Sequence, residues 1–207
     1  MTYNTYAFKT EIDWDIVPEE KIECWHWEET LEKTIRPNTY FKMCFLENVG
    51  IFARMRTDET NLRRVNTTPD SPVWEDSAME FFFIPVESRQ EYFNLEFNSN
   101  GAYLCHVGVA KKPKRKDISE FSKEVPVITP TVTKDGWSAE VFVPCKLVNE
   151  VLGENFEAKA SEIRGNFYKC GDLTEIPHFG SYAPVAEQYP GFHNPICFAN
   201  FSIKEKA

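Results

Sequence analysis

Short segments in which apolar and polar residues alternate recur along the chain, and turn-forming residues separate them. Residues 41–45 and 51–55 alternate in this way on either side of a turn at residues 47–50, which ends in glycine. Residues 92–98 alternate again, and the sequence Asn-Ser-Asn-Gly at 98–101 then turns the chain back. A repeat of two residues is typical of a β-strand with one buried face, and such turns join neighbouring strands into hairpins. The pattern predicts about nine short strands and restricts the chain to folds built on β-sheets.

Only residues 144–153 have the pattern of a helix, with a proline at the start and a glycine at the end. Their apolar residues share one side of such a helix: Leu147, Val148, Val151 and Leu152. At about 150 residues per domain, and with no repeat or linker, the 207 residues favour a single domain spanning 1–207. We predict an all-β fold, a two-sheet antiparallel β-sandwich of the immunoglobulin or jelly-roll kind, with one short helix near 144–153.

Aromatic residues are unusually frequent, since 17 Phe, 8 Tyr and 5 Trp together make 30 of the 207 residues. Rings in this number build either a bulky core or a surface on which a ligand can stack. Composition does not distinguish the two.

The chain is acidic, with 32 Asp and Glu against 23 Lys and Arg and a formal charge of −9. Because phosphate contacts need a positive field, we expect no nucleic-acid partner and no binding to an anionic membrane. The basic run at residues 111–116 is interpreted as a solvated loop, in preference to an anion-binding patch. The longest strongly apolar run, residues 81–86, is far shorter than the roughly 20 residues of a membrane-spanning helix.

The N-terminal residues are polar and then charged, without the basic and apolar segments of a secretory signal. We therefore expect a cytoplasmic protein. A chain that had lost its leader would look the same, so an extracellular location is the alternative.

The six cysteines are scattered, and most fall in expected strands, where a free thiol behaves as a small apolar group. The spacings Cys24–His26 and His193–Cys197 come nearest to a metal motif, but neither has the second pair that a four-ligand zinc site needs. We predict no cofactor, and the sequence leaves other metals and the oligomeric state open.

One acidic residue interrupts the most apolar of the expected strands. Residues 78–84 are apolar on both faces except for Glu80, and Trp74 comes shortly before them. Burying an unpaired carboxylate costs several kcal/mol, so Glu80 must face a partner, a metal or an open site. Either Trp74 lies in the core and Glu80 forms a salt bridge, or both face a binding site. Residues 170–195, rich in proline and with four aromatic residues, form a long loop of the kind that is usually functional.

An enzymatic and a redox function are also compatible with the sequence. Glu80 with Glu96 or Glu140 could supply the two carboxyl groups of a glycoside-processing enzyme, which lie about 5–10 Å apart around the scissile bond. Met79 and His106 could ligate a haem in a DOMON-type domain, although neither has a diagnostic neighbour. The sequence contains no Gly-x-Ser-x-Gly nucleophile motif and no glycine-rich phosphate loop.

Residues 74–82, Trp-Glu-Asp-Ser-Ala-Met-Glu-Phe-Phe, resemble the signature of carbohydrate-binding module family 9, in which a tryptophan, an aspartate, a glutamate and a phenylalanine follow one another. Further segments that resemble the family come in its order: 92–98, 136–141, 164–169 and 192–201. The resemblance extends from Trp74 to about Ile203.

This resemblance implies a DOMON-like β-sandwich that binds a mono- or oligosaccharide without catalysis. It implies a slot between two aromatic walls, with polar side chains that bind sugar hydroxyls. An aromatic ring suits the C–H face of a pyranose, a carboxylate accepts hydroxyl protons, and a lysine donates to oxygen. The ligand-binding residues that the resemblance implies are the walls Trp74 and Phe192, the acceptor Glu80, the donor Lys169, and the further contacts His193 and Asn194.

The sequence departs from the family pattern at two positions. Phe192 is smaller than the tryptophan that usually forms the second wall, and Glu96 stands where a basic hydrogen-bonding residue is usual. Structural calcium is a further implication of the family, for which Asp58, Glu59 and Asp76 are the acids near strand ends.

Overall fold

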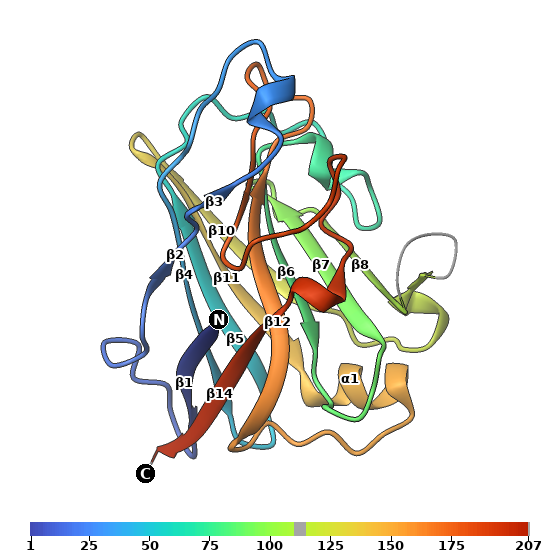
Figure 1. The fold of residues 1–207 in the computed structure, drawn as a ribbon. Coiled ribbons are helices and arrows are strands. Elements are labelled where there is room, and N and C mark those ends of the chain that lie inside the picture. Colours follow the sequence, from blue (N-terminus) through green and yellow to red (C-terminus); the bar gives the residue numbers. More distant parts are fainter. Residues whose placement is uncertain (110–114, 207) are drawn as a thin grey trace.

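The computed structural model describes residues 1–109 and 115–206, and it confirms the predicted all-β class (Figure 1). One α-helix, α1 (Cys145–Leu152), and four single-turn 3-10 helices, η1 (Glu28–Thr30), η2 (Val73–Glu75), η3 (Ile118–Glu120) and η4 (Pro195–Cys197), accompany the strands. The strands are β1 (Thr2–Phe8), β2 (Glu20–Lys21), β3 (Cys24–Trp25), β4 (Thr39–Leu46), β5 (Gly50–Thr57), β6 (Ala78–Ile84), β7 (Tyr92–Asn98), β8 (Tyr103–Gly108), β9 (Lys116–Asp117), β10 (Val127–Thr133), β11 (Gly136–Pro144), β12 (Ser161–Cys170), β13 (Phe179–Ser181) and β14 (Ala199–Lys206).

These 14 described strands belong to one hydrogen-bonded sheet, whose main path is β10-β11-β5-β4-β1-β14-β12-β6-β7-β8-β9. Strand β1 joins the two halves because it pairs with β4 on one side and β14 on the other, in parallel both times. The sheet is therefore mixed, which corrects the expectation of a purely antiparallel fold with two separate sheets. Alternation along the sequence marks a strand but does not say which strands it pairs with.

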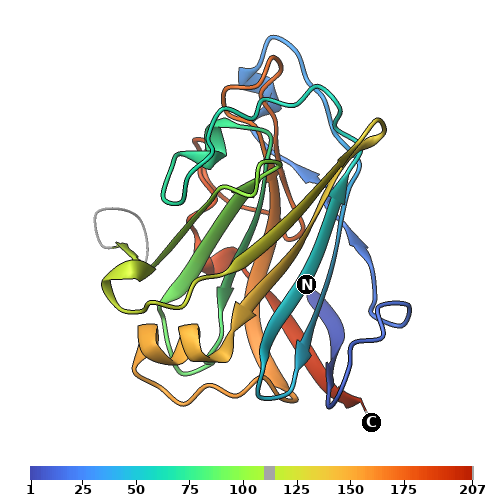
Figure 2. The same ribbon diagram turned by 180° about the vertical axis from the view of Figure 1, so that it is seen from behind.

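The sheet curls into a half-barrel, so that its two halves face each other across an apolar interior (Figures 1 and 2). Phe41 on β4 stacks on Phe167 on β12, with ring centroids 4.0 Å apart. Phe81 on β6 stacks on the same Phe167 at 4.3 Å. Much of the aromatic content thus serves a bulky core.

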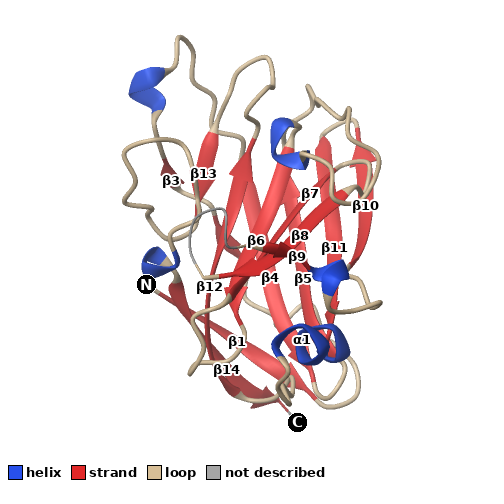
Figure 3. Cartoon of the chain, turned by 90° about the vertical axis from the view of Figure 1, so that its right-hand side faces the viewer, coloured by secondary structure: helices blue, strands red, loops and turns tan. Residues whose placement is uncertain are grey.

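Helix α1 forms where the sequence predicted it, and Gly153 ends it with a φ of +65°. Its buried Leu147 and Val148 belong to the interior cluster, and Figure 3 shows the helix at one end of the sheet. No helix within residues 1–109 or 115–206 is long and apolar enough to cross a membrane.

Strands β10 and β9 are the two ends of the main path of the sheet. Prolines interrupt residues 125–133, and β10, which contains Pro130, is an end strand of the main path, with mostly exposed residues. Residues 111–114 of the basic run lie outside the described residues, so its interpretation as a solvated loop is untested there. Arg115 and Lys116 are described, and the latter begins β9.

Alternation along β6 divides its residues between two apolar environments. Phe81 and Phe83 point into the interior of the half-barrel. Ala78 and Phe82 point to the outer face, where they belong to a second cluster that includes Trp27, Tyr168 and Phe192. The chain between β13 and β14 crosses in front of this outer face (Figure 1). The parity of β6 therefore directs Glu80 toward the space under that segment.

Candidate ligand-binding site

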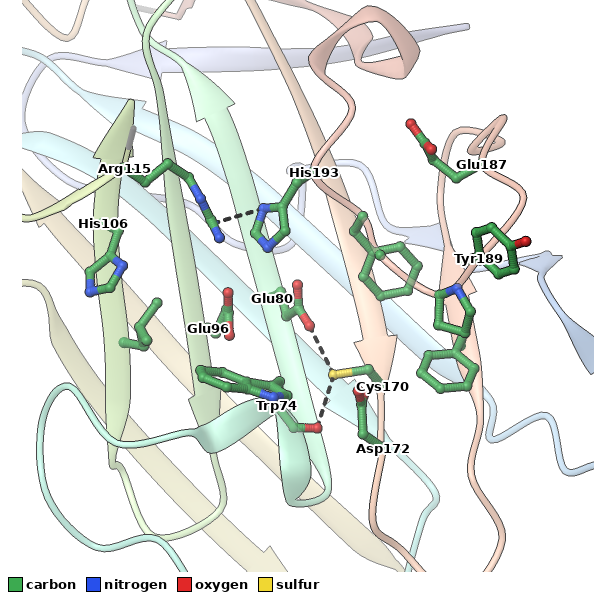
Figure 4. Close-up of a pocket in the computed structure, with 15 residues that line it drawn as sticks. Trp74, Glu80, Glu96, His106, Arg115, Cys170, Asp172, Glu187, Tyr189 and His193 are labelled. Atoms are coloured by element: carbon green, nitrogen blue, oxygen red, sulfur yellow. Dashed lines mark hydrogen bonds between the residues drawn. The ribbon is translucent and has the colours of Figure 1, made fainter. Parts of the chain in front are cut away.

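A pocket of about 470 Å³ lies on this outer face, over β6, β7, β8 and the end of β12 (Figure 4). Its walls combine aromatic rings with acidic and basic groups. The residues that line it are Trp74, Glu80, Glu96, Leu104, His106, Arg115, Cys170, Asp172, Phe179, Glu187, Tyr189, Pro190, Gly191, Phe192 and His193.

Two carboxyl groups form the floor of the pocket. Glu80 and Glu96 are directly opposite each other on β6 and β7, and each residue is only 3% exposed. The thiol of Cys170 donates a hydrogen bond of 2.8 Å to Oε1 of Glu80, and Nδ2 of Asn94 donates one of 2.9 Å to Oε1 of Glu96. Burial, and then the nearby Glu96, raise the pKa of Glu80 well above its usual value. Glu80 therefore holds its proton to a higher pH than an exposed glutamate does.

Asp172 adds a third acid at the rim. Burial, together with Glu75, raises the pKa of Asp172 to about 6. Its backbone N–H donates to the carbonyl oxygen of Trp74 at 3.2 Å, which ties the segment after β12 to η2. This hydrogen bond holds the Trp74 backbone beside the floor.

The opposite wall carries a network of hydrogen-bond donors. Nη1 of Arg115 donates to Nδ1 of His193 at 2.8 Å, and the hydroxyl of Tyr92 lies 3.1 Å from the same nitrogen. Because a guanidinium can only donate, Nδ1 accepts and a neutral His193 carries its proton on Nε2. The imidazole stacks on Phe82, with centroids 5.1 Å apart, and Figure 4 shows it between Arg115 and Glu80. The wall thus presents donors across from the acidic floor.

The two predicted aromatic walls differ in their accessibility. Trp74 on η2 is half-buried and lines the pocket. Phe192 also lines it but is only 5% exposed, because its ring stacks on Tyr168 at 4.3 Å and packs against Trp27 at 5.6 Å. Tyr189, which the sequence marks only as one of four aromatic residues in the long loop, lines the same pocket with 74% of its surface exposed.

The structure places Lys169 away from this pocket. Cys170 faces the pocket, so the preceding residue on the same strand points to the other side of the sheet. There the ammonium group of Lys169 is fully buried, 2.8 Å from Oε2 of Glu59 and 2.9 Å from Nε2 of His178. This corrects the placement of Lys169 beside the sugar.

Asn194 does not line the pocket either. Its Oδ1 accepts from the backbone N–H of Ile196 at 3.2 Å, at the start of η4. Its neighbour His193 does line the pocket.

The residues considered for haem ligation and for glycoside cleavage are mostly kept apart. Met79 lies in the interior cluster, whereas His106 lines the pocket on the outer face, so the two cannot ligate one haem. Glu140 pairs with Arg54 at 2.7 Å on an exposed part of β11 and does not line the pocket. Of the proposed carboxyl pairs, only Glu80 with Glu96 is brought together.

The three acids considered for calcium all have protein partners. Asp58 accepts from the backbone and side chain of Asn38. Glu59 pairs with Lys169. Asp76 pairs with Arg63 and accepts hydrogen bonds from backbone and side-chain groups nearby. A calcium ion at any of them would have to displace these partners.

The chain is a curled β-sheet module with a pocket of mixed aromatic and charged lining on its outer face. The family model of carbohydrate-binding family 9 matches residues 7–203, and the chain belongs to that family. This match confirms the resemblance carried by residues 74–82. Because family 9 consists of non-catalytic carbohydrate-binding modules, the chain is not assigned as an enzyme.

Solved structures share the fold at low sequence identity. A Bacteroides uniformis protein, to which carbohydrate binding has been provisionally assigned, is 20% identical, with 98% of each chain covered and a TM-score of 0.82. A family 9 module from Caldicellulosiruptor kristjanssonii in complex with glucose is 12% identical, with 100% of this chain and 97% of that chain covered and a TM-score of 0.68. The complex with cellotriose is 12% identical, with 99% and 95% covered and a TM-score of 0.63. No curated protein matches the sequence. None of these comparisons supports the DOMON-like description.

Proposed function

We propose that this chain binds a mono- or oligosaccharide, without catalysis, in the pocket over β6, β7 and β12. The observation that carries the proposal is that Trp74 and Glu80, both from the family signature, line one pocket. Its volume of about 470 Å³ lies within the usual range of small-molecule sites. The Caldicellulosiruptor module was solved with glucose and with cellotriose, which makes these two sugars the first ligands to test.

The pocket has the groups that a sugar needs. The indole of Trp74 offers a flat, rigid face for the C–H groups of a pyranose ring. Glu80 and Glu96 supply oxygens for hydroxyl groups at the floor, and Nε2–H of His193 and the guanidinium of Arg115 supply donors at the wall. A ring on the indole would therefore meet acceptors on one edge and donors on the other.

We assign the second wall to Tyr189 in place of Phe192. The ring of Phe192 is stacked on Tyr168 and nearly enclosed, so it has little surface to offer a sugar. Tyr189 is exposed and lines the same pocket, on the segment that Trp27 holds by donating from Nε1 to the carbonyl oxygen of Glu187 at 2.9 Å. Phe192 then supports the wall from behind.

Substitutions at Tyr189 and Phe192 distinguish the ring that contacts the sugar from the ring that packs behind it. Tyr189→Ala should weaken saccharide binding roughly 2- to 12-fold, the ~0.5–1.5 kcal/mol of an aromatic contact, and leave thermal unfolding unchanged. Phe192→Ala should lower the free energy of unfolding by about 3–5 kcal/mol, because it removes a packed ring. Calorimetric titration and thermal unfolding measure the two effects, and Tyr189→Phe, which keeps the ring, is the control. Unchanged affinity in Tyr189→Ala would return the second wall to Phe192.

A glycan array followed by calorimetric titration with glucose and cellotriose tests the function itself. The expected result is saturable binding of at least one saccharide, with no phenol released from a panel of aryl glycosides. Absence of binding to every glycan, or release of phenol by Glu80 and Glu96 acting together, would overturn the proposal.

A further inference from the structure

Cys170 links the two signature residues of the pocket. Its Sγ donates to Oε1 of Glu80 at 2.8 Å and also lies 3.8 Å from the carbonyl oxygen of Trp74 (Figure 4). Strand β12 brings it there, because Cys170 is the last residue of the strand and lies opposite Ala78 on β6. The family resemblance gave this position no role.

We propose that Cys170 is a positioning residue of the saccharide site: its thiol engages Oε1 of Glu80 and so leaves Oε2 for the hydroxyl groups of the ligand. That the ligand is a saccharide rests on the proposed function, and the positioning role of Cys170 rests on the observed hydrogen bond. It changes the expected contact, because the thiol occupies one acceptor site of Oε1, and Oε2 then becomes the main acceptor for the sugar.

The surroundings of Glu80 explain why a weak neutral donor fits here. Glu96 faces it from β7, Tyr168 lies opposite it on β12, and Asp172 and Arg115 act on it from the rim. His193 stands beside Arg115 on the wall and also faces Glu80 (Figure 4). Four of these six neighbours, counting Cys170, are acidic or weakly acidic, so another anion would be repelled.

Cys170 remains a donor because it keeps its proton. Burial, followed by the charge of Glu80, raises the pKa of the Cys170 thiol well above its usual value. A protonated thiol can direct its S–H only to an acceptor, and Oε1 of Glu80 is the nearest one. When Glu80 is ionised its carboxylate can only accept, and the thiol is then the donor of this hydrogen bond.

Substitutions at Cys170 test the role of the donor. Cys170→Ala should weaken binding of glucose or cellotriose about fivefold, the value of one lost hydrogen bond, whereas Cys170→Ser should stay within about twofold of the wild type. Removing the donor also favours the neutral form of Glu80. The pH at which binding changes should therefore rise in Cys170→Ala and stay unchanged in Cys170→Ser.

Cys105 provides a matched control. It is also a buried strand cysteine, but it lies in the interior apolar cluster. There Cys105→Ser should lower thermal stability more than Cys105→Ala, since it buries a hydroxyl among apolar groups. Neither variant should change saccharide affinity or its pH profile. At Cys170 the opposite order is expected: the serine variant should stay closer to the wild type than the alanine variant.

An infrared measurement tests the hydrogen bond without a sugar. The S–H stretching band of Cys170, isolated by subtracting the Cys170→Ala spectrum, should lie at lower frequency than that of Cys105 and move up in Glu80→Gln. A band unchanged by Glu80→Gln, or a Cys170→Ala protein with wild-type affinity and pH profile, would overturn the positioning role. A wild-type protein that binds no saccharide would overturn the proposed function instead, and the infrared result would still decide whether the thiol holds Glu80.

Discussion

Trp74→Ala is expected to reduce saccharide affinity by about 2–4 kcal/mol, or roughly 30- to 1,000-fold in Kd, which places it among the largest effects in the pocket. The indole is the largest flat surface that lines the pocket and stands beside the paired acids of the floor. Without it, a sugar would keep its hydroxyl contacts but lose the platform that orients its ring. Titration calorimetry with cellotriose measures the loss.

A second half-buried tryptophan controls for the general cost of removing an indole. Trp14 packs under the guanidinium of Arg54, 4.2 Å from the ring centroid, and does not line the pocket. Trp14→Ala should lower thermal stability to a similar extent as Trp74→Ala while binding remains at the wild-type level. Equal affinities in the two variants, or a Trp74→Ala protein that no longer folds while Trp14→Ala does, would identify Trp74 as a structural residue.

The local alternation of apolar and polar residues predicted the strands, whereas the pairing of strands far apart in the sequence was not predicted. The pattern of residues 78–84 and 92–98 corresponds to β6 and β7, and the helix predicted at 144–153 is α1. The parallel pairings of β1 with β4 and β14 were not predicted. The pairing with β14 joins residues nearly 200 positions apart, and no local pattern records it.

The parity of strands also explains which of the predicted residues line the pocket. Glu80 faces the pocket because β6 directs its even-numbered residues outward, and the same rule applied to β12 would have selected Cys170 over Lys169. Arg115 belongs to the basic run that was interpreted as a solvated loop. It lines the pocket because β9, which follows it directly, pairs with β8. For Tyr189, the aromatic content of its loop was the available signal. It does not show which rings would be enclosed.

Lys169, which the structure places away from the pocket, is expected to contribute strongly to stability. Lys169→Met should lower the free energy of unfolding by about 3–5 kcal/mol, because it leaves Glu59 as a buried charge that has lost its cation. At about 2–4 °C per kcal/mol for a chain of this size, the melting temperature should fall by roughly 6–20 °C. Burial raises the pKa of Glu59, but Lys169 and His178 outweigh it and bring the pKa below its usual value. Glu59 is therefore ionised in the folded protein.

Two further variants show whether the charge itself is responsible. Glu59→Gln combined with Lys169→Met removes both charges and should recover most of the lost stability, since buried pairs tolerate joint replacement far better than single removal. Lys159→Met breaks the pair with Glu157, in which both side chains are exposed, and should change stability by less than about 1 kcal/mol. Thermal and urea unfolding at pH 7 measure all three. A Lys169→Met protein as stable as Lys159→Met would mean that the buried pair contributes nothing to the fold, and a strong loss of saccharide affinity in Lys169→Met at full stability would return Lys169 to the binding site.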